Sequence, residues 1–226
     1  MTFTRLTTIA GLASVSLLVS SCFITTEATD AASGDIRKVS GSAKVSSNER
    51  LADISLVNGS LKMANDSSAK AVSTVNGSIE LRDNVRLDSA STVNGSIESG
   101  TGLQVADELR TVNGKISLGS NAAIGGDIAT VNGDITLDNS QAGGDITTVN
   151  GDIRLVGNTV VKGNIVYKPR GKKNSFFSWS SNKATLYISA NATVEGNIIL
   201  EQEVELQIEN AAMQDKIIQR FNTDTN

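Results

Sequence analysis

One short motif, Val-Asn-Gly between apolar residues, recurs six times through the middle of this chain. Successive copies are 18, 18, 19, 19 and 18 residues apart, at Asn58, Asn76, Asn94, Asn113, Asn132 and Asn150. A fixed period this short, built from turn-forming and β-forming residues, is typical of stacked repeat architectures. The repeat therefore restricts the fold class more than any other feature of the sequence.

Two strand arrangements are compatible with an Asn-Gly pair between apolar residues. In a two-residue hairpin, Val131 would face Asp134 and Thr130 would face Ile135, so every repeat would place charge or hydroxyl beside hydrocarbon. In a parallel coil, each residue instead lies over its equivalent in the next coil, about 4.8 Å away. Stacking explains why identical residues recur at identical positions, so we favour a coil over an antiparallel meander.

We therefore predict an all-β fold, a single parallel β-solenoid over residues 35–209 with about 18 residues per coil and ~9 coils. Either hand of winding is compatible with the pattern. Ile135 and Leu137 are expected to point into the core from one face, and Ile128 and Val131 from the others. The repeated asparagines are expected to turn inward at a corner and to hydrogen-bond the backbone of neighbouring coils.

Residues 210–226 are predicted to form a short capping helix and a tail. Asn210 is a suitable N-cap, and Met213, Ile217 and Phe221 recur every four residues, as on one face of an amphipathic helix. Such a helix would cover the C-terminal sheet edges, which otherwise invite pairing with another chain. A helix lying on a membrane surface is the alternative.

The N-terminus has the features of a secretory signal. Residues 1–21 carry one positive charge and then a weakly apolar stretch that is too short and too polar for a stable membrane-spanning helix. The run Val19-Ser-Ser-Cys22 resembles the lipobox of bacterial lipoproteins. That resemblance implies cleavage before Cys22 and attachment of diacylglycerol to its thiol, and residues 22–34 would then be a flexible tether. An ordinary cleaved signal followed by a free thiol is the alternative.

The same resemblance implies a location in the cell envelope. Phe23, rather than Asp, follows the cysteine, so the signal that retains enteric lipoproteins in the inner membrane is missing. We therefore expect a lipid anchor in the outer membrane of a host that has two membranes.

The composition argues against most catalytic functions. The chain has no histidine and a formal net charge of −4, which excludes a histidine general base and argues against a nucleic-acid partner. The nearest equivalent of a carboxylate site is a set of stacked aspartates: Asp127, Asp134, Asp145 and Asp152. We interpret them as a solvated outer face, with Lys115 close enough to Asp134 for a weak ion pair. A loose calcium site and a catalytic carboxylate pair are the alternatives; we expect no metal, no cofactor and no enzymatic activity.

One segment, residues 168–183, interrupts the repeat. It combines basic and aromatic side chains without an acidic one, and its candidate binding residues are Lys168, Arg170, Lys172, Lys173, Phe176, Phe177 and Trp179. Such a loop suits an anionic lipid, an envelope polysaccharide or an acidic protein partner. Alternatively, the aromatic side chains fold back over the core and the basic groups are only solvated.

The Val-Asn-Gly-(Ser/Asp)-Ile repeat after a lipobox resembles the bacterial β-strand-repeat proteins that are described as adhesin-like, over about residues 35–165. The segments Val161-Lys-Gly-Asn-Ile165 and Val194-Glu-Gly-Asn-Ile198 are similar to coils of the bactofilins, which form cytoskeletal polymers. These resemblances imply a non-enzymatic envelope lipoprotein that acts as a rigid scaffold or binding surface. The alternatives are an envelope β-helix that polymerises end to end and a carbohydrate-active β-helix enzyme.

Overall fold

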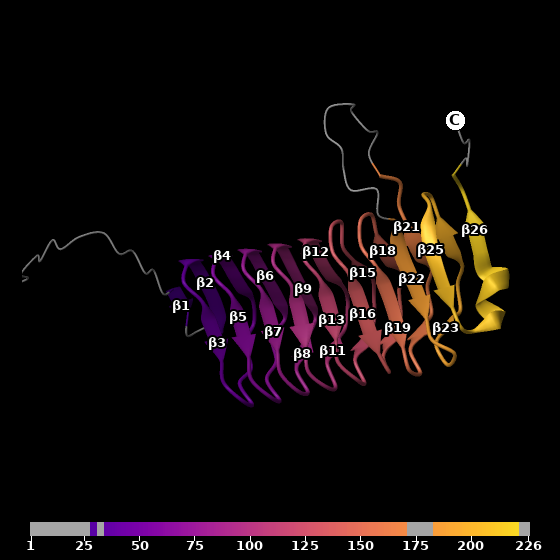
Figure 1. Ribbon diagram of the computed structural model, residues 1–226. Coiled ribbons are helices and arrows are strands. Elements are labelled where there is room, and N and C mark those ends of the chain that lie inside the picture. Colours follow the sequence, from indigo (N-terminus) through magenta and orange to yellow (C-terminus); the bar gives the residue numbers. More distant parts are fainter. Residues whose placement is uncertain (1–27, 31–33, 171–182, 222–226) are drawn as a thin grey trace, which may run out of the picture.

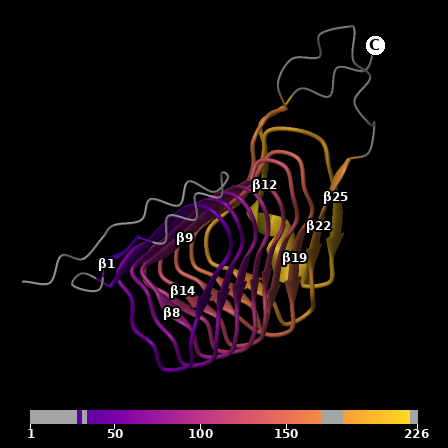
Figure 2. The same ribbon diagram turned by 90° about the vertical axis from the view of Figure 1, so that its left-hand side faces the viewer.

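The computed structural model describes residues 28–30, 34–170 and 183–221. This part of the chain winds into one parallel β-solenoid, whose turns, or rungs, stack side by side along a common axis (Figure 1). Seen along that axis, the rungs form closed loops around a shared interior (Figure 2). The predicted fold class is confirmed, with about 9 turns of about 19 residues each.

The strands of the described residues form three sheets, which we call sheets A, B and C. Sheet A contains β1 (Ala28–Asp30), β2 (Asp35–Ser40), β4 (Ile54–Asn58), β6 (Ala71–Asn76), β9 (Ser89–Asn94), β12 (Leu109–Asn113), β15 (Ile128–Ala129), β18 (Ile146–Thr148), β21 (Ile165–Tyr167), β24 (Ile198–Leu200) and β26 (Ile217–Gln219). Sheet B contains β3 (Ala43–Val45), β5 (Leu61–Met63), β7 (Ile79–Leu81), β10 (Ile97–Ser99), β13 (Ile116–Leu118), β16 (Ile135–Asp138), β19 (Ile153–Val156), β22 (Ala184–Ile188) and β25 (Val204–Ile208). Sheet C contains β8 (Arg86–Leu87), β11 (Gln104–Val105), β14 (Ala123–Ile124), β17 (Gln141–Ala142), β20 (Val160–Val161) and β23 (Thr193–Val194).

Equivalent residues of successive rungs pair in parallel. Asn58 pairs with Asn76, and Asn76 with Asn94, in the ladder of sheet A. In sheet B, Ile116 pairs with Ile135, and Ile135 with Ile153. This register places like over like and excludes the hairpin arrangement. The interior is correspondingly a continuous column of buried Ile, Leu and Val side chains, including Ile128, Ile135 and Leu137.

Val131 does not face the core, so that part of the prediction is wrong. The valines of the motif are 38–41% exposed at Val57, Val75, Val93, Val112 and Val131. The buried residue is the preceding Thr130, whose hydroxyl Oγ1 donates a hydrogen bond to the Gly114 carbonyl oxygen at 3.3 Å. A buried threonine satisfies a corner carbonyl that a valine could not, and the alternation along the chain then turns the valine outward.

The repeated asparagines also point outward, not inward. Their side chains hydrogen-bond one another along the axis, as where Asn113 Nδ2 donates to Asn94 Oδ1 at 2.8 Å and Asn132 Nδ2 donates to Asn113 Oδ1 at 2.8 Å. They do link neighbouring coils, as expected, but through side chains on the surface. The glycine that follows is required by close approach: a Cβ on Gly114 would lie 2.0 Å from the carbonyl oxygen of Gly95.

Both ends of the solenoid differ from the prediction. Within the expected tether, β1 pairs antiparallel with β2 and so covers the N-terminal edge of sheet A. The expected C-terminal α-helix is a 3-10 helix of six residues, η1 (Ala211–Lys216), capped as predicted by Asn210, whose Oδ1 accepts from the Ala212 amide at 3.2 Å. The chain then continues as β26, parallel to β24.

The β-branched pair Ile217–Ile218 stacks on Ile198–Ile199, so the segment completes a last rung and does not form a helical lid. No helix in the described part of the chain is both long and apolar enough to cross a membrane.

Candidate functional site

The sites predicted near the chain ends and in the insertion are only partly described. Cys22, Lys172, Lys173, Phe176, Phe177 and Trp179 lie outside the described residues. Lys168 and Arg170 are described and exposed, and they follow directly after β21. Tyr167 pairs with Thr148, so Lys168 lies at the corner where the preceding rung carries Val-Asn-Gly.

Tyr167 holds the base of this segment in place. Its buried hydroxyl accepts a hydrogen bond from the Ile153 amide at 3.1 Å and donates to the Thr185 carbonyl oxygen at 2.9 Å. One rung earlier, the equivalent amide of Ile135 bonds to the Asp152 carbonyl, so the tyrosine hydroxyl replaces a ladder acceptor where the rung is interrupted. Burial raises the pKa of the Tyr167 hydroxyl far above its usual value.

A second contact fixes the same corner. The buried Gln202 amide Nε2 donates to the Val149 carbonyl oxygen at 2.6 Å and to the Lys168 carbonyl oxygen at 2.8 Å. The start of the basic segment is therefore tied to the rungs on both sides of it.

The stacked aspartates serve the backbone of the next rung. Asp127 Oδ1 accepts from the Asp145 amide at 2.9 Å, and Asp134 Oδ1 accepts from the Asp152 amide at 2.9 Å. Asp152 Oδ1 in turn accepts from the Thr185 amide at 2.8 Å. Within the described ranges, no group of three or more His, Cys, Asp or Glu side chains is placed to hold a metal ion.

Lys115 pairs with a different residue from the one expected. Its Nζ lies 2.9 Å from Glu98 Oε1 on sheet B, so Asp134 is not its partner. The same face carries Glu80 between Lys62, at 3.0 Å, and Arg82, at 2.7 Å. The hydrogen bond from Lys62 lowers the pKa of the Glu80 carboxyl. The Lys62–Glu80 and Lys115–Glu98 pairs link neighbouring rungs, whereas Arg82 reaches Glu80 within one rung.

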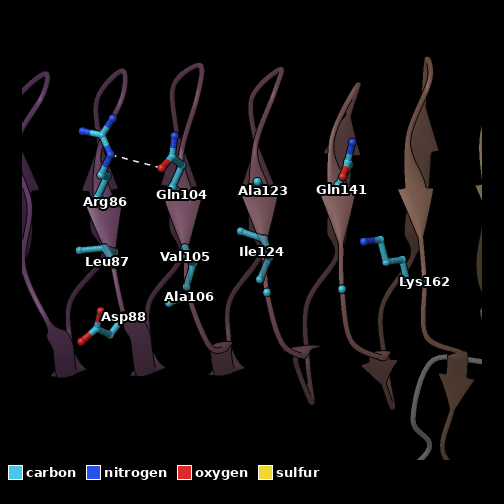
Figure 3. A pocket seen from close by; sticks show the side chains of 12 residues that line it. Arg86, Leu87, Asp88, Gln104, Val105, Ala106, Ala123, Ile124, Gln141 and Lys162 are labelled. Atoms are coloured by element: carbon cyan, nitrogen blue, oxygen red, sulfur yellow. Dashed lines mark hydrogen bonds between the residues drawn. The ribbon is translucent and has the colours of Figure 1, made fainter.

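Sheet C carries a feature that the sequence analysis missed, a shallow open trough of about 550 Å³. Five successive rungs line it (Figure 3). Arg86, Gln104, Ala123 and Gln141 occupy equivalent outward positions on four of them. Ala106, Gly125 and Gly143 form the floor two residues later, and Lys162 on the fifth rung is in register with this floor row. Arg86 Nε donates a hydrogen bond to Gln104 Oε1 on the neighbouring rung, at 3.2 Å.

A sequence signal for the trough exists. Gln104, Ala123 and Gln141 each directly precede a buried residue of the repeat, so their outward direction follows from strand alternation. The concavity does not follow, because it depends on how closely the rungs pack. Comparisons of the chain with protein families, with known proteins and with solved structures found no match.

Proposed function

We propose that this protein is a non-enzymatic, lipid-anchored scaffold of the bacterial cell envelope that presents binding surfaces on a rigid rod. The observation that carries the proposal is the parallel ladder that joins like residues of successive rungs. Asparagine and aspartate side chains of successive rungs bond to one another or to the next backbone amide, which ties the rungs together along the axis. Nine stacked strands in sheet B correspond to a described rod of ~40 Å.

The anchor rests on Cys22 and on the resemblance of Val19-Ser-Ser-Cys22 to a lipobox. A single covalent lipid chain gives only weak membrane binding, whereas diacylglycerol supplies two chains and stable attachment. An adhesin-like role within the β-strand-repeat proteins belongs to the same proposal, and the outer membrane is the proposed location.

The anchor is tested by fatty-acid labelling in a bacterial host. The wild-type chain should incorporate a labelled fatty acid and sediment with membranes, whereas the Cys22→Ser variant should be unlabelled. A Ser21→Ala variant, which keeps a small residue before the cysteine, serves as the matched control and should remain labelled. An unlabelled wild-type protein recovered in the soluble fraction would refute the anchor.

The basic segment is the first candidate binding surface of the scaffold. Its described residues Lys168 and Arg170 are exposed on a base that is pinned by Tyr167 and Gln202. Charge reversal of Lys168, Arg170, Lys172 and Lys173 should weaken binding to anionic vesicles or acidic glycans. The same number of reversals at Arg37, Lys44, Arg50 and Lys70 should not. Equal binding by both variants would remove this surface from the proposal.

End-to-end polymerisation is the second candidate, and the last rung favours it. Val204, Leu206 and Ile208 of β25 are only partly buried, whereas their equivalents on β22 are buried. Among the described strands, none pairs with the outer edge of β25. Such an edge is a template for another chain. Truncation after Glu209 removes η1 and β26 and should promote filaments, and soluble monomers or amorphous aggregates would count against this function.

A further inference from the structure

The trough on sheet C repeats along the solenoid axis. Gln104 pairs with Ala123, and Ala123 pairs with Gln141, in the parallel ladder. The two glutamines therefore lie two rungs apart, about 9.6 Å along the axis. Figure 3 shows them projecting from alternate strands, with Ala123 between them.

The floor of the trough stays at the level of the backbone for a structural reason. A Cβ on Gly125 would lie 2.2 Å from the Ala106 carbonyl oxygen, and a Cβ on Gly143 would lie 2.3 Å from the Gly125 carbonyl oxygen. The backbone amide of Gly125 donates a hydrogen bond to the Val105 carbonyl oxygen, and that of Gly143 donates to the Ile124 carbonyl oxygen. The floor is thus smooth, and the glutamine amides are the polar groups that project over its middle.

Charge is confined to the ends of the trough. Arg86 and Asp88 belong to its first rung and Lys162 to its last, four rungs or about 19 Å apart. The three rungs between them contribute Gln104, Ala123 and Gln141 with the floor. The backbone amide of Gln141 donates to the Ala122 carbonyl oxygen. No described residue hydrogen-bonds to the side-chain amide of Gln141, which can both donate and accept. The middle of the trough therefore suits an uncharged, hydroxyl-rich ligand.

We propose that this trough binds an extended, uncharged β-1,4-linked polysaccharide, which lies along the solenoid axis with one sugar ring per rung. The spacing of rungs, about 4.8 Å, is close to the advance of one pyranose ring in such a chain. Successive rings of an extended β-1,4 chain are turned over relative to each other, so the same ring edge faces a surface at every second sugar. Glutamines on alternate rungs match that alternation, and Ala123 leaves room for the ring between them.

This inference deepens the proposed scaffold function by naming a ligand class for one of its faces. The residues that line the trough do not include Lys168 or Arg170, which follow β21 of sheet A, so the two surfaces can be tested separately. Two sources share the ligand chemistry, a chain of N-acetylhexosamines and an unsubstituted glucan. They are distinguished by the probes below.

The experiment measures binding of chitohexaose and cellohexaose to the purified protein, by calorimetry or by chemical-shift changes up to millimolar oligosaccharide. Maltohexaose, in which α-linkages give a curved chain, is the control ligand and should bind at least tenfold more weakly. Gln141→Ala should weaken binding about two- to tenfold, as expected for one net hydrogen bond. Ala123→Trp should abolish binding because it fills the middle of the exposed trough.

Ser91→Trp is the matched control variant, since Ser91 is an exposed outward position on sheet A. This variant should bind as the wild type does. Thermal unfolding should show that each variant is folded. If Ala123→Trp does not fold, Gln141→Ala still tests the proposal. Preference for chitohexaose supports an N-acetylated ligand, and preference for cellohexaose supports the plain glucan. Failure of both to bind, equal binding of maltohexaose, or binding insensitive to both trough variants overturns the assignment, while fatty-acid labelling at Cys22 would still support the scaffold.

Discussion

Replacing Gly114 by alanine should destabilise the solenoid far more than a surface substitution normally does. The new Cβ would lie 2.0 Å from the Gly95 carbonyl oxygen and 2.5 Å from its carbon, where 3.0 Å is the limit of real contacts. The two rungs must therefore separate locally by about 1 Å. Hydrogen bonds tolerate a narrow range of lengths, so the bonds at this corner would weaken or break. These are Gly95 N to Asn113 O at 3.1 Å and Ile97 N to Lys115 O at 2.9 Å, which both join these two rungs.

The magnitude follows from three contributions. Overpacking costs about 1–3 kcal/mol. Two lost backbone hydrogen bonds add about 0.5–1.5 kcal/mol each. Alanine lowers the conformational entropy of the unfolded chain relative to glycine, which offsets about 0.4–1 kcal/mol of this loss. The expected net loss in the free energy of unfolding is about 3 kcal/mol, which lowers the Tm by ~6–12 °C in a domain of this size.

Thermal and urea unfolding, followed by circular dichroism, measure this loss. Val112→Ala is the matched control, because Val112 belongs to the same corner but points into solvent, and it should cost less than about 1 kcal/mol. If Gly114→Ala unfolds within ~0.5 kcal/mol of the wild type, the range typical of neutral surface changes, then close approach of the rungs is not what requires glycine here.

Three further predictions test other contacts. Thr130→Val should lose about 0.5–1.5 kcal/mol in urea unfolding, despite its greater hydrophobicity, because the Gly114 carbonyl loses its donor; a stabilised variant would show that only apolar burial matters there. Asp134→Ala should lose a similar amount by removing the acceptor of the Asp152 amide, whereas Asp134→Asn should retain most of it, and an equal loss in both would contradict this role. Because the pKa of Tyr167 is raised in the folded state, its contribution to stability is complete below the unfolded pKa near 10 and is lost as pH rises above it, by up to ~1.4 kcal/mol per pH unit. Tyr167→Phe should flatten this alkaline limb, as monitored by unfolding and by tyrosinate absorbance, and an unchanged limb would refute the assignment.

The fold was predictable because equivalent positions of stacked rungs have the same surroundings and therefore tend to carry the same residue. A residue that stacks on its own equivalent must suit both copies, so Ile116, Ile135 and Ile153 recur at a fixed spacing. The interior direction of Ile128, Ile135 and Leu137 follows from their apolarity and is confirmed. Apolarity alone gave the wrong direction for Val131. The neighbouring Thr130 is buried instead, because its hydroxyl donates a hydrogen bond to the Gly114 carbonyl oxygen at the corner.

The C-terminal segment shows the same limit for local patterns. Met213, Ile217 and Phe221 have helical spacing, yet only Ala211–Lys216 is helical and Ile217 begins a strand. An existing sheet edge at β24 offers hydrogen bonds to an Ile-Ile pair of high β-propensity. Tertiary context therefore overrides a helical periodicity of only two or three turns.

The ladder also restricts where specificity can arise in such a molecule. A side chain repeated on every rung produces a uniform row, and the outward asparagines of such a row hydrogen-bond to one another. Recognition needs groups that differ between rungs. In the described chain, Gln104, Ala123 and Gln141 differ between successive rungs of sheet C. A second difference lies at Lys168, which stands at the corner where the preceding rung carries Val-Asn-Gly. The residues that break the repeat, not those that define it, are therefore the ones from which binding should be sought.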